Sequence, residues 1–129
     1  MSHLPWMDLW HVWNESRQIE LANRMKLAAS SRERCRGLLG ATGLAAGQGL
    51  WIRPCNSIHT FGMSFAIDVV YIDREHWVRK VVRNIPAWRI SLCLMAHSVI
   101  EFPAGTIEHT GTQRGDHLCL TRIQGKIRP

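Results

Sequence analysis

The sequence predicts a mainly β fold, a small sandwich or barrel-like domain with one or two short helices. Short runs rich in β-branched and apolar residues recur along the chain, and turn-forming residues separate them. Many short strands joined by turns are typical of a sandwich or a small barrel. With 129 residues, a hydrophobic fraction of 46% and no internal repeat, the chain has the size and composition of one globular domain.

The first predicted unit is a β-hairpin. Residues 10–13 and 17–27 are its strands, because the polar segment 14–16 between them favours a turn. The alternative is a short aromatic helix, since three tryptophans have helical spacing, namely Trp6, Trp10 and Trp13. We favour the hairpin because of its turn chemistry.

A short helix is predicted over residues 32–39. Ser30 and Glu33 have the spacing of a capping box, in which each side chain bonds the backbone N–H of the other residue. Three residues then share one face of the helix, namely Cys35, Leu38 and Leu39. Gly40 suits the C-terminal cap, and a strand over residues 50–53 follows a glycine-rich stretch.

The clearest strand is the run IDVVYI at residues 67–72. It is apolar and β-branched on both faces, which predicts a central place in a sheet. Residues 73–76 form a turn, and residues 77–82 return as the next strand. Residues 84–96 contain Pro86 and are predicted as a long connection.

The C-terminal part is predicted to alternate strands and turns. A strand at 98–102 precedes one helical turn at 106–111, and the last strand covers 117–123. Four residues between these elements are assigned structural roles in turns, namely Gly105, Thr106, Gly115 and Asp116. Glycine permits a positive φ, while Thr and Asp side chains can cap neighbouring amides.

Residues 10–123 are predicted to be a single β-rich domain, between an N-terminal segment (1–9) and a basic C-terminal tail (124–129). We expect both ends to be loosely held. No apolar run approaches the roughly 18 residues that span a bilayer. The first residues lack the basic region and the cleavage site of a signal peptide, so we expect a cytoplasmic protein.

The net charge of +6 permits binding to nucleic acid or to another acidic surface. The basic residues are scattered, however, and the densest group lies within 32–36. The four cysteines form no C-x-x-C pair, which argues against a zinc knuckle or a thioredoxin-type motif. We expect these thiols to be reduced and mostly buried, and we predict neither a metal nor a cofactor.

Five residues form the candidate binding site, namely Cys55, Ser57, His59, Asp68 and Glu101. Asp68 shares a strand face with Val70 and Ile72, where a carboxylate is costly unless it is hydrogen-bonded or paired. It is either a structural acceptor, for backbone amides of the 55–62 loop or for an arginine, or a functional group with a shifted pKa. Glu101 either belongs to the site or forms an ion pair with Arg53 or Arg79.

Catalytic and metal-binding alternatives remain open for these residues. His59 paired with Asp68 has the composition of a general base. Cys55 lies four residues before His59, which allows a Cys–His nucleophile. Metal binding is a further alternative, although no H-E-x-x-H or equivalent spacing is present.

Three sequence blocks carry a family resemblance. They are Arg-Gly-Leu at 36–38, Met63 followed by the strand with Asp68, and Pro-Ala-Gly-Thr at 103–106 followed by Gly-Asp at 115–116. With these blocks in this order, the chain resembles the domain-of-unknown-function 192 family, and the resemblance covers roughly residues 10–120, nearly the whole chain. The resemblance implies a mainly β, sandwich-like fold and supplies no established reaction. Some members accompany pilus or secretion genes, which implies a link to such systems.

The segment around Met63 departs from the commonest family pattern. Many members read Trp-Met-Lys-Asn-Thr there, whereas this chain reads His-Thr-Phe-Gly-Met at 59–63, a second variant of the family. Members often have proline before the strand, where this chain has Ala66. A polar contact made by the Lys-Asn pair therefore does not carry over to this chain.

No arrangement of residues points to catalysis, so the leading hypothesis is a small non-enzymatic binding or accessory module. Its polar cleft would lie near His59, Asp68 and Glu101. The first alternative is a small hydrolytic or metal-dependent enzyme that uses His59 and Asp68, and the second is a weak nucleic-acid binder. The sequence leaves open the ligand or protein partner, and whether the chain is a monomer or a dimer.

Overall fold

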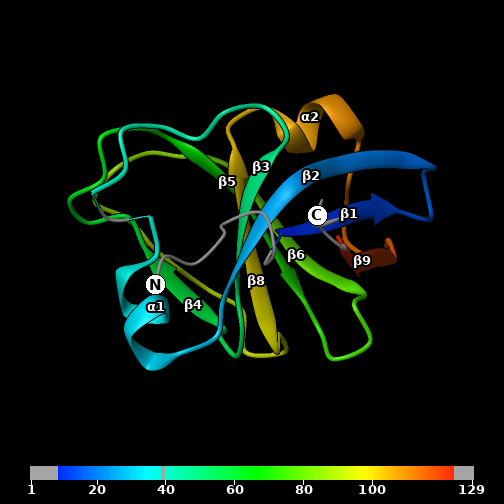
Figure 1. Cartoon of the computed structure of the whole chain (residues 1–129), viewed down its shortest axis with the longest axis horizontal. Coiled ribbons are helices and arrows are strands. Elements are labelled where there is room, and N and C mark those ends of the chain that lie inside the picture. The colour runs from blue at the N-terminus through cyan, green and yellow to red at the C-terminus, as the bar shows by residue number, and fades with distance from the viewer. Residues whose placement is uncertain (1–8, 39, 124–129) are drawn as a thin grey trace, which may run out of the picture.

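One curled sheet of seven strands dominates the fold (Figure 1). The computed structural model describes residues 9–38 and 40–123. Its strands are β1 (Leu9–Asn14), β2 (Ile19–Ala28), β3 (Gln48–Ile52), β4 (Ser57–His59), β5 (Ile67–Ile72), β6 (Val78–Ile85), β7 (Ile90–Leu92), β8 (Ser98–Pro103) and β9 (Leu118–Arg122), and its helices are α1 (Ser31–Arg36) and α2 (Thr106–Thr110). The large sheet has the order β6-β5-β8-β3-β2-β1-β9, and β4 pairs with β7 in a small second sheet. The predicted mainly β class is confirmed.

The run at 67–72 forms the predicted strand, β5, which is an interior strand of the large sheet next to the edge strand β6. It pairs antiparallel with β6 on one side and with β8 on the other, and all six of its residues are buried. Successive side chains of a strand point to opposite faces, so β5 contributes to two separate cores. Val70 and Ile72 belong to one core, whereas Ile67, Val69 and Tyr71 belong to the other.

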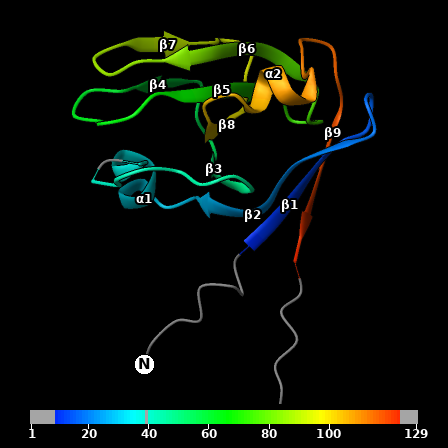
Figure 2. The ribbon, with the colours of Figure 1, turned by 90° about the horizontal axis from the view of Figure 1, so that it is seen from above.

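The two cores lie on opposite faces of the large sheet. The first core, around Trp51 and Phe102, is closed by the curled part of the sheet that contains β1, β2 and β9. The second core is covered by the small sheet, which contributes Ile58 from β4. Figure 2 shows this layering, with β4 and β7 alongside β5 and β6. A hydrogen bond of 2.9 Å from Tyr71 Oη to Ser91 Oγ ties the small sheet to β5.

The predicted N-terminal hairpin is confirmed. β1 pairs antiparallel with β2, and Trp10 is opposite Met25. The ring of Trp10 meets the buried ring of Trp51 edge-on at 5.1 Å between centroids, an arrangement that aromatic quadrupoles favour. The alternative aromatic helix is therefore wrong for Trp10. Trp6 lies outside the described residues, as do most of the expected N-terminal segment and the C-terminal tail.

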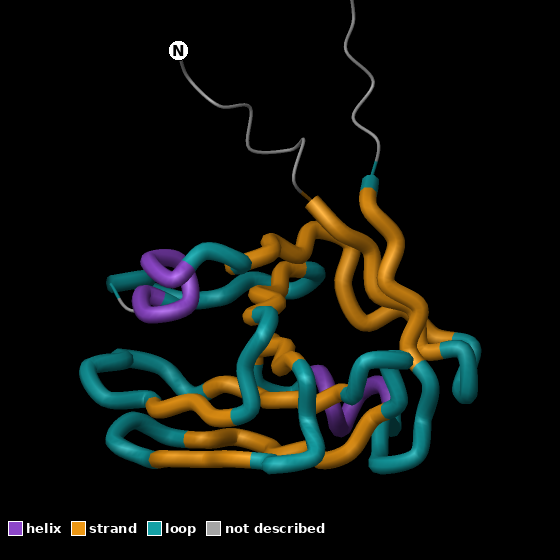
Figure 3. Tube along the Cα trace, turned by 90° about the horizontal axis from the view of Figure 1, so that it is seen from below, coloured by secondary structure: helices purple, strands orange, loops and turns teal. Residues whose placement is uncertain are grey.

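The predicted short helix exists but ends earlier than expected. Ser30 and Glu33 form the capping box in both directions. The helix α1 stops at Gly37, which has a φ of 52° and donates its N–H to the Glu33 carbonyl, so Gly37 and not Gly40 is the cap. Glycine at this position avoids the Cβ clash of a positive φ. Figure 3 shows α1 at the end of β2, where it opens the connection to β3.

The prediction of a long connection over 84–96 is wrong. β6 continues to Ile85, and β7 occupies Ile90–Leu92 inside this segment. Its partner β4 was not predicted either. Each of the two strands has three residues, too few to show a period of two, and they form because they pair with each other. None of the described helices has the length and hydrophobicity that crossing a lipid bilayer requires.

Candidate functional site

A cleft of about 360 Å³ lies between α1, β3 and the segment that leads into and out of β4. Four of the five predicted site residues line it, namely Cys55, Ser57, His59 and Glu101. Its walls are largely apolar, with Ile52, Ile58 and Met63 as buried contributors. A polar group surrounded by apolar walls is the usual composition of a small-molecule site.

Glu101 is the most buried polar group of this cleft. It lies in β8, opposite Leu50 of β3 and Val69 of β5, so strand alternation points its side chain into the second core. The residue is only 3% exposed, and its Oε1 is the one buried side-chain oxygen or nitrogen in the described residues without a hydrogen-bond partner. Burial raises the pKa of Glu101 from its ordinary 4.5 to about 7.

The ion pair considered for Glu101 does not form. Arg79 donates from Nε to Asp73 Oδ2 at 2.9 Å, and the Arg53 guanidinium lies over the Trp51 ring at 4.5 Å. Both arginines are therefore held by other groups. Glu101 lacks the compensating cation that buried carboxylates usually have.

Cys55 lies in the cleft as a thiol. Its Sγ donates to the Ser57 carbonyl at 2.9 Å. Burial raises the pKa of Cys55, and the nearby Glu101 raises it further, against the opposing effects of the Ser57 carbonyl contact and of Arg34. A nucleophilic cysteine needs a lowered pKa, so the environment does not favour the Cys–His nucleophile. The described thiols of Cys55, Cys93 and Cys119 are all free and partly buried.

His59 lies at the mouth of the cleft, at the end of β4. Its Nδ1 accepts the Phe61 backbone N–H at 3.3 Å, and its ring lies 4.9 Å from the Phe61 ring. The Phe61 ring in turn stacks on Trp88 at 5.6 Å. His59 is therefore oriented by its own loop and belongs to an aromatic row that leads out of the cleft.

Asp68 is not part of the cleft, which corrects its assignment to the candidate site. Its Oδ1 accepts the Asn84 N–H at 2.8 Å, and its Oδ2 accepts those of Gly105 at 3.1 Å and Ile107 at 2.8 Å. These amides belong to the end of β6 and to the start of α2, not to the 55–62 loop. Because Asp68 faces the first core and Glu101 the second, the pairing of His59 with Asp68, considered as an alternative, does not form.

The turn residues Gly105, Thr106, Gly115 and Asp116 support the backbone. Gly105 and Gly115 have φ values of 99° and 94°, which glycine adopts without strain. Thr106 Oγ1 donates to the Pro103 carbonyl at 2.8 Å. The positive φ values allow the chain to turn before α2 and before β9, and the Thr106 hydrogen bond stabilises the first of these turns.

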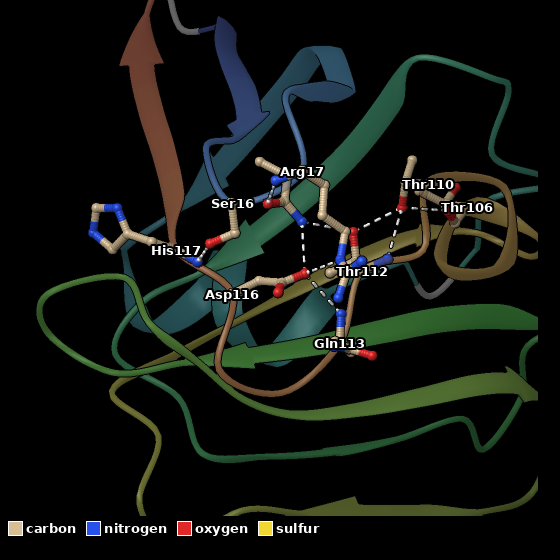
Figure 4. Close-up of polar contacts among 9 residues, drawn as sticks. Ser16, Arg17, Thr106, Thr110, Thr112, Gln113, Asp116 and His117 are labelled. Atoms are coloured by element: carbon tan, nitrogen blue, oxygen red, sulfur yellow. Dashed lines mark hydrogen bonds and ion pairs between the residues drawn. The ribbon is translucent and has the colours of Figure 1, made fainter.

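Asp116 is the centre of a buried polar network (Figure 4). Its Oδ2 accepts from Asn14 Nδ2 at 3.0 Å, from Arg17 Nε at 2.7 Å and from the Gln113 N–H at 3.0 Å. Burial by itself raises the pKa of Asp116, but the hydrogen bonds from Asn14 and Arg17 hold it below its ordinary value. The network joins the β1–β2 turn to the turn before β9, so its role is structural. Its partners are about 100 residues apart in sequence, so local sequence patterns could not predict their contact.

Sequence reasoning missed several residues of the cleft. Arg34 comes from α1, and Leu38 follows the end of that helix. Phe61 and Met63 complete the loop after β4. The His-Thr-Phe-Gly-Met segment was the available signal, because it places alternate residues of one loop beside His59. Among the described residues, no group of three or more His, Cys, Asp or Glu side chains is arranged to hold a metal ion.

Comparison with known proteins identifies the family. The model of the family DUF192, described as "Uncharacterized ACR", matches residues 12–120, which is most of the chain. The chain belongs to the DUF192 family. No curated protein matches it in sequence. In the three sequence blocks that carry the resemblance, Gly37, Leu38 and Met63 line the cleft, whereas Asp68 and Asp116 accept hydrogen bonds from backbone amides.

Two solved structures share the fold. One is a protein from Sinorhizobium meliloti that is described, provisionally, as a transcription regulator; it has a TM-score of 0.74 and 20% identity over 85% of this chain and 90% of its own. The other, from Novosphingobium aromaticivorans, is described as a protein of unknown function, with a TM-score of 0.74 and 19% identity over 86% of this chain and 83% of its own. Identities this low establish a common fold and no more.

Proposed function

We propose that this DUF192 protein is a small non-enzymatic binding module whose cleft holds a compact, mostly apolar ligand with one hydrogen-bond donor. The observation that carries the proposal is the buried Oε1 of Glu101, which has no hydrogen-bond partner among the described residues. A buried acceptor without a partner costs about 1–3 kcal/mol. A ligand that donates to Glu101 would recover this free energy.

The rest of the cleft supports the same class of ligand. Ile52, Ile58 and Met63 offer apolar contact, and Phe61 offers an aromatic face at the mouth. The Cys55 thiol is occupied by the Ser57 carbonyl. We further propose that His-Thr-Phe-Gly-Met is a family variant that shapes this mouth, because three of its five residues line the cleft, namely His59, Phe61 and Met63.

The proposal predicts a head-group preference that three simple probes can measure. Hexylamine and hexanol share a six-carbon tail, hexanoate has a five-carbon tail beside its carboxylate, and the three probes differ mainly in the group presented to Glu101. Above pH 7, where the Glu101 carboxylate is ionised, we expect hexylammonium to bind best, hexanol less well and hexanoate worst. Amide chemical-shift changes in NMR spectra would report the affinity and locate the binding near Ile58 and Glu101.

A matched pair of variants connects the preference to Glu101. Glu101→Gln is expected to remove the preference for the amine, whereas Glu108→Gln, an exposed carboxylate on α2, is expected to leave it unchanged. The proposal is wrong if none of the three probes perturbs the cleft residues. It is also wrong if Glu101→Gln retains the full preference for hexylamine.

A further inference from the structure

The outer face of the small sheet carries an unusual group of exposed apolar side chains. Trp88 is 67% exposed, Ile90 67%, Leu92 48% and Leu94 79%, and Met95 continues the group at 62%. We call these five residues the β7 surface. Exposed apolar side chains are normal one at a time, but a contiguous group of large ones marks an interaction site.

The fold itself turns these side chains outward. In β7, Ser91 points inward to the Tyr71 hydroxyl, so strand alternation places Ile90 and Leu92 on the outside. Trp88 adopts a φ of 65°, a conformation that is rare and strained for a bulky residue, and its ring is held outward against Phe61. Strand geometry therefore fixes the exposure of Ile90 and Leu92, and the contact with Phe61 fixes that of Trp88.

Three cations border the same surface. Lys80, Arg83 and Arg89 line a groove of about 490 Å³ between β6 and β7, together with Ile90 and Leu92. None of the three forms an ion pair within the described part of the chain. The sequence has no Asp or Glu between residues 76 and 100. Two acidic residues, Asp73 and Glu75, line a hollow that also contains Met95, and Asp73 is paired there with Arg79.

We propose that the β7 surface binds an anionic lipid bilayer. Exposures of 62–79% for four of the side chains mean that much of each side chain projects into solvent, although Ile90 also lines the groove between β6 and β7 and Met95 borders a second hollow. Such side chains need a deformable phase to bury them, whereas a rigid protein partner would need a matching cavity for each. Tryptophan and aliphatic side chains bordered by unpaired cations have the chemistry that the lipid headgroup region favours. This inference is independent of the cleft and of its ligand.

Sedimentation of the full chain with lipid vesicles tests the proposal. We expect binding to vesicles of phosphatidylcholine mixed with phosphatidylglycerol, and little binding to phosphatidylcholine alone. Arg83→Glu is expected to weaken the binding about fivefold or more, because each cation near an anionic surface contributes about that factor. Arg114→Glu, in the exposed turn before β9, makes the same change in net charge away from the β7 surface. It is expected to weaken vesicle binding less than Arg83→Glu does.

A second pair of variants tests the apolar contribution. The double substitution Ile90→Ser with Leu94→Ser is expected to weaken binding at least about tenfold. Trp77→Ser, which removes a 46% exposed side chain outside the β7 surface, is expected to leave binding unchanged. Thermal unfolding verifies that each variant folds, and Leu94→Ser alone replaces the double variant if that one does not.

Three results would overturn the proposal. One is failure of the folded wild-type chain to bind the anionic vesicles. Another is that Arg83→Glu and Arg114→Glu weaken vesicle binding equally while the serine variants bind as the wild type does. Binding would then depend on net charge alone. The third is a dimer in sedimentation velocity that the serine variants dissociate, which would assign the β7 surface to a second copy of the chain.

Discussion

Glu101 shows how much a single buried carboxyl group can determine. Strand pairing places it between Val69 and Leu50, and the surrounding core gives its Oε1 no partner within the described residues. A group in this position is a strained component of the fold and, at the same time, the strongest indication of a ligand. Because the pKa of Glu101 is raised, the free-energy cost of burying its carboxyl group depends on pH.

Because the folded state holds the Glu101 proton more tightly than the unfolded state, the contribution of Glu101 to stability is greatest below pH 4.5 and falls as the pH rises through about 7. Glu101→Gln removes this titration. We expect the variant to gain up to about 3 kcal/mol in free energy of unfolding over the wild type above pH 7. Urea denaturation across pH measures the difference, and an equal pH dependence in both proteins would contradict the prediction.

At the scale of elements, Asp68 acts as a connector. It lies in β5, next to the edge strand β6, and its carboxylate reaches the end of β6 and the first residues of α2. Gly105, before α2, has no side chain to cap the helix, so Asp68 supplies the missing acceptor. Asp116 performs a similar task between two turns. In both cases a buried acid joins segments that are distant in sequence.

The connector role of Asp68 predicts a loss of stability without a loss of ligand binding. An asparagine can accept at only one of its two side-chain positions, so Asp68→Asn is expected to cost about 3 kcal/mol of unfolding free energy. Hexylamine is expected to bind the folded variant as it binds the wild type. Denaturation and NMR titration measure these two quantities. Unchanged stability together with lost binding would instead return Asp68 to the functional site.

At the scale of the whole molecule, the central sheet is covered on both faces. One core is closed by the curl of the sheet itself, and the other by the β4–β7 sheet. The cleft with Glu101 belongs to the second core, and so does the inner face of the strand that bears the β7 surface. The Asp68 and Asp116 connectors therefore support the fold from outside the cleft.

This division predicts that substitutions in the two cores act independently. Ile72→Val removes a methylene group from the first core, and Ile67→Val removes one from the second. Each is expected to cost about 0.5–1.5 kcal/mol. The two positions are about 16 Å apart along β5, so the double variant should match the sum within about 0.5 kcal/mol. Chemical denaturation of the four proteins forms the cycle, and a larger coupling would indicate one shared core.

The sequence by itself determined the fold class, the first hairpin, the capping box and the buried strand at 67–72, because these depend on local patterns. A β-branched run such as 67–72 is recognisable without knowing its neighbours. The sequence also singled out four residues that meet in the cleft, since three of them lie within one short loop and strand. Family membership follows from the match of the family model to residues 12–120, most of the chain.

Only the tertiary structure decided which acid belongs to the cleft. Asp68 and Glu101 look alike in sequence, each an acid within an apolar strand, but the register of β5 and β8 sends them to opposite faces of the sheet. The strands β4 and β7 exist because they pair with each other, which no three-residue pattern reveals. The partners of Asp68 and Asp116 are brought together by chain crossings that depend on the whole fold, so local physical chemistry could not identify them.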